Sequence, residues 1–162
     1  MTIQNKTVLV TGGAGYIGSH LVELLKNEGC TVRVLDRPGA ETGHLEGVEL
    51  IEGDICSHDS MREATLGCDV VMHLAANPNL WAKDPAEFEA VNHQGTRRVL
   101  EAAAAAEVDR TIYVSTESIL TPRKPIDVIS ESVRTELADM IGPYCRSKWL
   151  AEQAAFEAAE NG

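Results

Sequence analysis

The chain has 162 residues, of which 44% are apolar and 24% charged, as is ordinary for a globular protein. Its 25 acidic and 14 basic residues give a formal net charge of −11. This charge argues against nucleic acid and anionic membrane surfaces as partners, because binding to nucleic acid depends on neutralising phosphates. From the length we expect one domain, residues 1–162.

The N-terminus runs directly into an apolar segment, with no signal-peptide pattern, and the sequence contains no apolar run long enough to span a membrane. The four cysteines and five histidines show no CxxC motif and no metal-ligand spacing. We therefore expect reduced thiols, no bound metal and a cytoplasmic location.

Strand-like and helix-like segments alternate along the chain. Short apolar or β-branched runs predict strands at residues 7–11, 31–35 (ending in Asp36), 48–52, 69–74 and 111–114. Apolar residues at helical spacing predict helices at 16–28, 57–66, 85–107 and 142–160. Gly29 marks the end of the first helix, and Asp59 and Ser60 are capping candidates in the second. Segments 37–47 and 121–140 are predicted to be irregular.

Five strands separated by helices indicate βαβ units. This pattern predicts an α/β fold with a doubly wound parallel sheet of the Rossmann type, helices on both faces, and strand order 3-2-1-4-5.

A glycine-rich segment, TGGAGYIG at 11–18, follows the first predicted strand and opens the first helix. It fits the dinucleotide-binding fingerprint in the spacing Gly13-x-Gly15-x-x-Gly18, and its wider variant in Gly12-x-x-Gly15-x-x-Gly18. Glycines there let the backbone approach a pyrophosphate that binds at the helix N-terminus. A bound dinucleotide is therefore predicted.

Two neighbouring residues bear on which dinucleotide binds. Asp36, at the end of the second strand, can accept hydrogen bonds from both ribose hydroxyls of NAD. Arg37 can instead pair with the 2′-phosphate of NADP, which Asp36 would repel. NAD is favoured and NADP stays open. Asp54, after the third strand, can accept from the adenine amino group, although it can equally be a solvated turn residue.

A second group of residues points to proton transfer. Tyr144 and Lys148 lie four residues apart on a predicted helix and so share one face. A free tyrosine titrates near 10, and a neighbouring ammonium favours the phenolate that a base needs near neutral pH. Thr116, with Ser115, ends the fifth strand, where a hydroxyl can bond a substrate oxygen. Asn92 and Thr96 can reach the same end of the sheet, whereas His73 is expected to be packed rather than catalytic.

The motifs together resemble the extended short-chain dehydrogenase/reductase family, the NAD-dependent epimerase/dehydratase group, from residue 6 to about residue 160. They are TGGAGYIG at 11–18, Gly53-Asp54-Ile55, His73-Leu74-Ala75-Ala76, Asn92-x-x-Gly95-Thr96, Ser115-Thr116 and Tyr144-x-x-x-Lys148. Residues 80–85 and 139–144 look most like the dihydroflavonol-reductase-like, hopanoid-associated sugar epimerase subgroup.

The resemblance implies hydride transfer to or from a hydroxyl or keto carbon, with Tyr144 moving the proton. Thr116, Tyr144 and Lys148 match the catalytic triad, and Asn92 matches the asparagine that helps to position the lysine through water. The predicted cofactor-binding residues are Gly12, Gly15, Tyr16, Ile17, Gly18, Asp36, Arg37, Asp54, Ile55, Leu74, Ala75, Ala76, Tyr144 and Lys148. The expected substrate is a small molecule, a sugar nucleotide or a hydroxy or keto compound, and the family suggests a homodimer formed by the long helix and the Tyr144 helix.

The sequence departs from the family pattern in two places. Residues 119–121 read Ile-Leu-Thr where a tyrosine- and glycine-containing turn is usual. Family members also continue into a sixth strand and a substrate lobe, so we expect this chain to be truncated before the sixth strand, with an unpaired apolar strand edge. The alternative function is therefore a dinucleotide-binding module without turnover, or an inactive fragment.

Overall fold

The computed structural model describes residues 3–123 and 128–161. The chain divides into two units. The sheet unit comprises Met1–Ala76 and Arg98–Val114, and the helical unit comprises Asn77–Arg97 and Ser115–Gly162. The expectation that residues 1–162 form a single domain stays a prediction.

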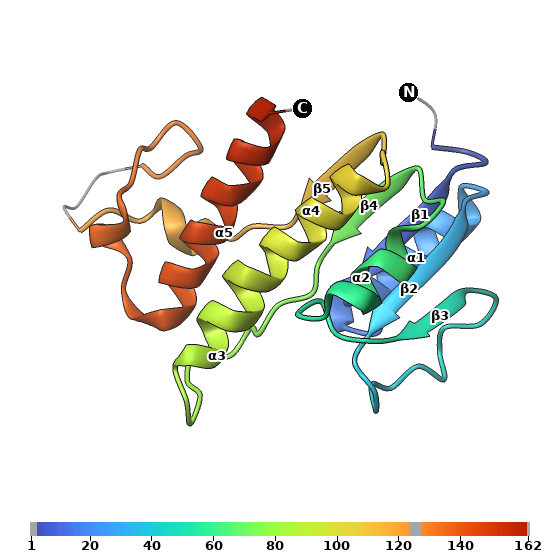
Figure 1. Ribbon diagram of the computed structural model, residues 1–162. Helices are drawn as coiled ribbons and strands as arrows, with labels where there is room; N and C mark the ends of the chain where they lie inside the picture. The colour runs from blue at the N-terminus through green and yellow to red at the C-terminus, as the bar shows by residue number, and fades with distance from the viewer. Residues whose placement is uncertain (1–2, 124–127, 162) are drawn as a thin grey trace. The chain divides into compact units, whose positions relative to one another are not determined.

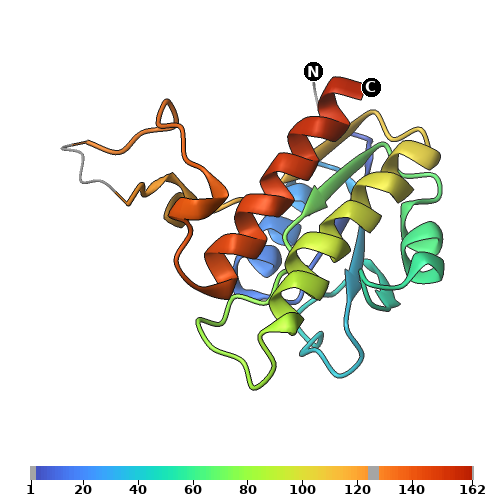
Figure 2. The ribbon, with the colours of Figure 1, turned by 60° about the vertical axis from the view of Figure 1, so that its left-hand side comes forward.

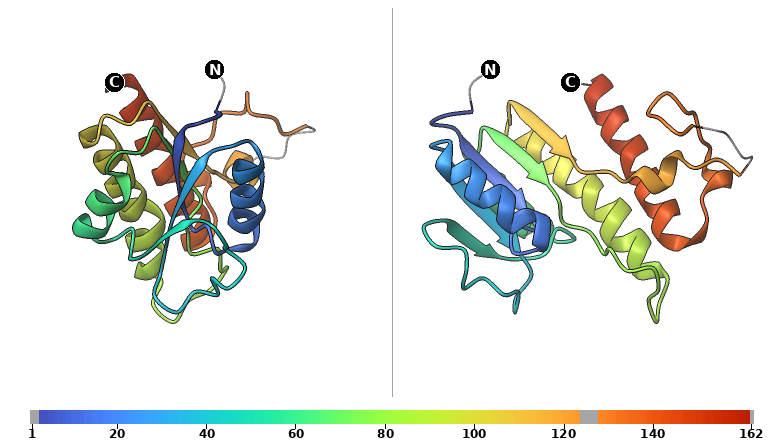
Figure 3. Two further views of the ribbon diagram at one scale, coloured as in Figure 1. Left: turned by 90° about the vertical axis from the view of Figure 1, so that its right-hand side faces the viewer. Right: turned by 180° about the vertical axis from the view of Figure 1, so that it is seen from behind.

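The sheet unit is built on a five-stranded parallel sheet in the order β3-β2-β1-β4-β5 (Figure 1). The strands are β1 (Thr7–Thr11), β2 (Thr31–Asp36), β3 (Glu49–Glu52), β4 (Val70–His73) and β5 (Arg110–Tyr113). Figure 3 (left) shows α1 (Tyr16–Asn27) on one face, with α2 (His58–Thr65) and α4 (Thr96–Ala105) on the other. The predicted fold class and strand order are confirmed, and strand ends differ from the prediction by one residue at most.

Valines dominate the core of the sheet unit, because a parallel strand covered on both faces is apolar along its whole length. In the register, Val8 lies beside Val32 and Val10 beside Val34. The buried residues of this cluster are Val8, Val10, Val22, Leu25, Val32, Val34 and Val70.

Helix α2 begins differently from the sequence expectation. Its N-cap is Ser57, whose hydroxyl accepts a hydrogen bond from the Ser60 N–H at 3.3 Å. Asp59 and Ser60, the two residues proposed as caps, already lie inside the helix. The prediction was wrong because both are good capping residues by type, and a serine one turn earlier satisfies the first free N–H groups better.

The helical unit holds the last helix, α5 (Gly142–Asn161), which packs against the π-helical segment η1 (Glu89–Gly95). Figure 2 shows α5 running beside α3 (Ala86–Phe88) and η1. Two 3-10 segments, η2 (Glu117–Leu120) and η3 (Leu137–Asp139), also contact α5. The predicted helix at 85–107 is thus interrupted by a π segment. Of the predicted irregular stretch 121–140, residues 124–127 lie outside the described residues.

No helix within residues 3–123 and 128–161 combines the length and apolar character that a membrane crossing requires.

Arg33 on β2 closes the C-terminal end of α2. Its Nη1 donates to the carbonyls of Ala64 at 2.9 Å and Leu66 at 2.7 Å. These carbonyls belong to the last turn of the helix, where no intrahelical N–H is available. A charged side chain on the sheet therefore fixes the position of α2.

We expect Arg33→Ala to lower the free energy of unfolding by about 1–3 kcal/mol, because two carbonyls lose a charged donor. Urea unfolding measures this change. Arg62→Ala is the matched control, since the Arg62–Asp59 pair is 82% and 85% exposed, and it should change the free energy by less than about 0.5 kcal/mol. Equal losses in the two variants would contradict the role of Arg33.

Candidate active site

The glycine-rich turn joins β1 to α1 and is built from backbone-to-backbone contacts. Gly12 has a φ of +73°, and a Cβ there would lie 2.8 Å from the Ala75 nitrogen. A Cβ on Gly18 would overlap the Gly12 carbonyl oxygen. Only glycine fits either position, so the predicted strand–turn–helix context of the fingerprint is present.

The N-terminus of α1 fits the pyrophosphate of a dinucleotide. Its N-cap is Gly15, which has no side chain to cap the helix, and the first turn holds no acidic residue. The side chains of Tyr16 and Ile17 are exposed. N–H groups at such a helix end attract an anion.

Asp36 braces the same turn. One carboxylate oxygen accepts from the Ala14 N–H at 2.9 Å and the other from the Arg37 N–H at 2.8 Å. Each oxygen has a second lone pair, so the carboxylate can still accept from ribose hydroxyls. These two hydrogen bonds of Asp36 were not predicted from the sequence.

Asp54 forms its own turn, with Oδ1 accepting from the Cys56 N–H at 2.8 Å. Ile55 beside it is buried. The β4 end is tied to β1, because Ala75 donates its N–H to Thr11 Oγ1 at 3.3 Å. His73 is buried and pairs with the same hydroxyl at 2.7 Å, as expected of a packed residue.

The residues predicted to take part in proton transfer all lie in the helical unit. Tyr144 and Lys148 occupy successive turns of α5, which places them on one face. Lys148 is only 5% exposed. Burial lowers the pKa of its ammonium to about 8, although Glu152 one turn further along acts in the opposite direction.

Asn92 lies in the middle of η1 and is 1% exposed. Its Oδ1 accepts from the Asn77 N–H at 2.7 Å, and its Nδ2 donates to the Asn77 carbonyl and to Ser147 Oγ, each at 3.1 Å. Thr96 donates its hydroxyl to the Asn92 carbonyl at 2.6 Å. Asn92 therefore contacts the residue next to Lys148.

Thr116 caps η2 and belongs to a small polar cluster. Its hydroxyl lies 3.1 Å from Glu117 Oε2 and 2.8 Å from Ser118 Oγ, and it accepts from the Ser118 N–H at 3.3 Å. The carboxylate only accepts, so the single Thr116 proton goes to Glu117 and Ser118 donates to Thr116. The contacts of Glu117 and Ser118 with Thr116, and of Ser147 with Asn92, were not predicted from the sequence.

The predicted residues fall into two sets, each within one unit. The sheet unit holds the predicted cofactor contacts from Gly12 to Ala76. The helical unit holds Asn92, Thr116, Tyr144 and Lys148.

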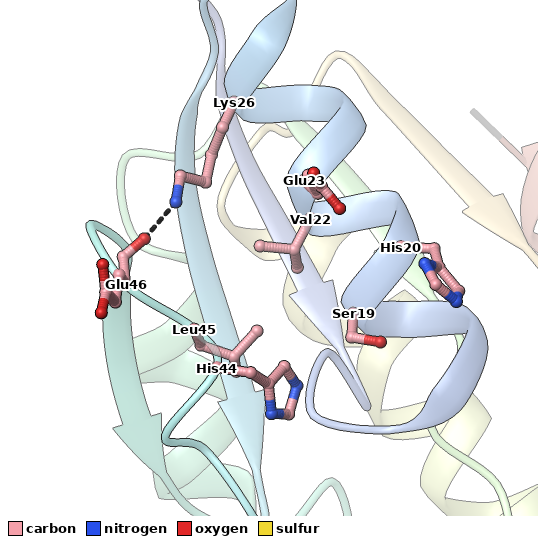
Figure 4. A pocket seen from close by; sticks show the side chains of 8 residues that line it. All are labelled: Ser19, His20, Val22, Glu23, Lys26, His44, Leu45 and Glu46. Atoms are coloured by element: carbon pink, nitrogen blue, oxygen red, sulfur yellow. Dashed lines mark hydrogen bonds between the residues drawn. The ribbon is translucent and has the colours of Figure 1, made fainter.

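A hollow of about 450 Å³ opens between α1 and the segment before β3 (Figure 4). Its lining residues are Ser19, His20, Val22, Glu23, Lys26, His44, Leu45 and Glu46. Lys26 crosses it to donate to the Glu46 carbonyl. None of these residues was predicted to bind the cofactor or to act in catalysis.

A glycine turn at a helix N-terminus, a Tyr–Lys pair on one helix face and a hydroxyl after β5 are motifs typical of dinucleotide-dependent oxidoreductases. The chain belongs to the NAD-dependent epimerase/dehydratase family, whose sequence model matches residues 8–162. This confirms the predicted family and, at the level of the family, the predicted nicotinamide dinucleotide cofactor.

Three proteins illustrate the similarity. A dihydroflavonol 4-reductase-like protein of Synechocystis is 34% identical over 94% of this chain and 45% of its own. A short-chain dehydrogenase/reductase superfamily protein of Agrobacterium tumefaciens, solved with bound NAD, is 31% identical with a TM-score of 0.83 over 96% of this chain and 46% of its own. A UDP-glucose 4-epimerase of Stenotrophomonas maltophila was solved with NAD and formylated UDP-arabinopyranose. It is 27% identical, with a TM-score of 0.86 over 98% of this chain and 50% of its own. The chain thus spans about half the length of the relatives it matches.

The lowered pKa of Lys148 makes stability depend on pH. Its ordinary pKa is 10.5 and its folded pKa about 8, so between these values the unfolded chain binds more protons. The contribution of Lys148 to stability is complete above pH 10.5 and is lost as the pH falls towards 8. The contribution of Lys148 to the free energy of unfolding is therefore about 3 kcal/mol lower at pH values well below the folded pKa than at pH values well above the unfolded pKa.

We expect the free energy of unfolding of the parent to rise with pH across this window relative to that of Lys148→Met. Urea unfolding of both proteins at a series of pH values measures the difference, in which the titration of other groups cancels. Parallel curves for the two proteins would contradict the burial of a titrating Lys148.

Proposed function

We propose that this chain carries the cofactor-binding and proton-transfer residues of an NAD-dependent oxidoreductase of the epimerase, dehydratase or reductase type. The observation that supports it most is the buried Lys148 one turn from Tyr144 on α5. A buried lysine is costly to fold, and a role beside a phenol that must ionise gives it a purpose.

The cofactor would be held by the glycine turn at Gly12, Gly15 and Gly18, with Asp36 at the adenosine ribose. When bound, a nicotinamide dinucleotide supplies hydride transfer to or from the substrate carbon. We propose NAD as the cofactor, because the charge of Asp36 lies beside the turn through its bond to Ala14 and would repel a 2′-phosphate.

Tyr144 would act as the acid/base. In oxidation, its phenolate takes the proton from the substrate hydroxyl while the carbon loses hydride; in reduction, both transfers reverse. The Lys148 ammonium stabilises the phenolate, and the Thr116 hydroxyl bonds the substrate oxygen. Asn92 holds the Tyr144 helix through Ser147.

The proposed substrate is a sugar nucleotide or a similar hydroxy or keto compound. The Synechocystis relative is named for a reductase and the Stenotrophomonas structure for a UDP-glucose epimerase. Both activities share the hydride step described above.

Two further proposals concern assembly and location. The family resemblance suggests a homodimer, which would use the long helix and α5, on which Phe156 is exposed. All four cysteines are thiols rather than disulfides, which fits a reducing compartment and a cytoplasmic location.

A dinucleotide-binding module without turnover is the second candidate. What favours it is the Thr116 hydroxyl, whose one proton is already given to Glu117. A substrate oxygen would have to displace that contact before Thr116 could donate to it.

Cofactor choice can be tested with Asp36→Asn, which keeps an acceptor for the Ala14 N–H and removes the charge. We expect the parent to bind NADH more tightly than NADPH, and the variant to narrow that preference by about tenfold. Fluorescence titration with both cofactors measures this. If the parent prefers NADPH, Arg37 rather than Asp36 determines the cofactor. If NADH does not bind at about millimolar concentration, both candidate functions are contradicted.

Catalysis can be tested with Tyr144→Phe. We expect turnover to fall by about 10²- to 10⁴-fold, because the phenol proton is lost, with NADH binding retained. With a dihydroflavonol as substrate, the loss of NADH absorbance measures turnover. With UDP-glucose, chromatography of the sugar nucleotides measures turnover, because an epimerase returns the hydride and leaves no net change in NADH. Tyr113→Phe is the matched control, since it removes a phenol hydroxyl from β5. If the two variants and the parent turn over equally, Tyr144 is not the acid/base.

A further inference from the structure

A chain of hydrogen bonds, buried at its centre, connects three parts of the helical unit. It runs from the backbone of Asn77 through the Asn92 carboxamide to the Ser147 hydroxyl, which donates to the Tyr144 carbonyl at 2.8 Å. Ser147 is 2% exposed. The chain thus ends on the backbone of the proposed acid/base residue.

The bonding fixes the direction of each group in this chain. The Asn77 N–H needs an acceptor and the Asn77 carbonyl needs a donor, so only one orientation of the Asn92 amide satisfies both. The second Nδ2 proton then points to Ser147 Oγ. Ser147 accepts this proton and gives its own to the Tyr144 carbonyl.

Asn92 lies in a π-helical segment, η1. A π turn widens the helix and changes the direction of the side chains that follow, and such segments occur often at functional sites. Thr96 donates its hydroxyl to the Asn92 backbone carbonyl. The backbone and the side chain of Asn92 are therefore both hydrogen-bonded within the helical unit.

We propose that Ser147 is a positioning residue for the Tyr144–Lys148 pair. Its hydroxyl links the Asn92 amide to the first turn of α5 and so fixes the rotation of that helix against η1. This inference rests on the proposed function only for its consequence in catalysis, because the link itself is a property of the folded chain.

The test is the titration of Lys148 by NMR of the ¹⁵N-labelled side-chain amine, assigned with Lys148→Met. In the parent the midpoint should lie at about 8. Ser147→Ala removes the link, lets α5 loosen from η1 and admits water to Lys148, so the midpoint should rise by about 0.5–1. An unchanged midpoint would overturn the proposal.

Ala154→Gly is the control, because Ala154 is buried on α5 two turns beyond the pair. It should destabilise the helix by about 1 kcal/mol and leave the Lys148 midpoint at its parent value. An equal rise in both variants would show general loosening and also overturn the proposal. If Ser147→Ala does not fold, Ser147→Cys keeps the volume, weakens both bonds and should raise the midpoint in the same direction.

Turnover separates this inference from the proposed function. If the protein transfers hydride, Ser147→Ala should lower kcat by about tenfold or more with KM nearly constant. If it does not, the Lys148 midpoint still decides whether Ser147 positions the pair.

Discussion

The sheet unit depends on one steric constraint, the close approach of α1 to the end of β1. The Gly12 carbonyl lies where a Cβ of Gly18 would be, and Gly12 itself lies against the backbone of Ala75. Larger residues would push the helix from the sheet and separate β1 from the β4 end. The same absence of side chains leaves the helix N-terminus open to an anion, so one constraint serves both packing and binding.

The positive charge comes from different groups in the two units. A chain of net charge −11 can bind an anionic dinucleotide because backbone N–H groups attract the phosphates locally. In the helical unit the positive charge is that of one buried side chain, Lys148. Its lowered pKa reflects the cost of removing that charge from water. Under the proposed function, this cost is offset by the action of the Lys148 charge on the neighbouring Tyr144 phenol.

The parts that follow from local rules could be predicted from the sequence. The predictions of the valine-rich strands, the glycine turn and the strand order were correct, because each depends on residue type and spacing along the chain. The π segment at Glu89–Gly95 and the bonds of Asn92 to Ser147 were not foreseen. No periodicity signals a single π turn, and a hydroxyl buried between two helices looks in sequence like any other serine. The same reason hid Glu117, whose contact with Thr116 depends on how the chain turns after β5.

Under the proposed function, the direction of the Thr116 hydrogen bonds limits how a substrate oxygen can bind. The hydroxyl gives its proton to Glu117 and receives one from Ser118. In the proposed mechanism the single proton of a substrate alcohol goes to Tyr144, so an alcohol oxygen and a ketone oxygen must both accept from Thr116. In either direction of the reaction the substrate oxygen therefore has to replace Glu117 as the acceptor of the Thr116 proton. A hydrogen bond to a carboxylate is stronger than one between neutral groups, so substrate binding has to offset the loss of this bond.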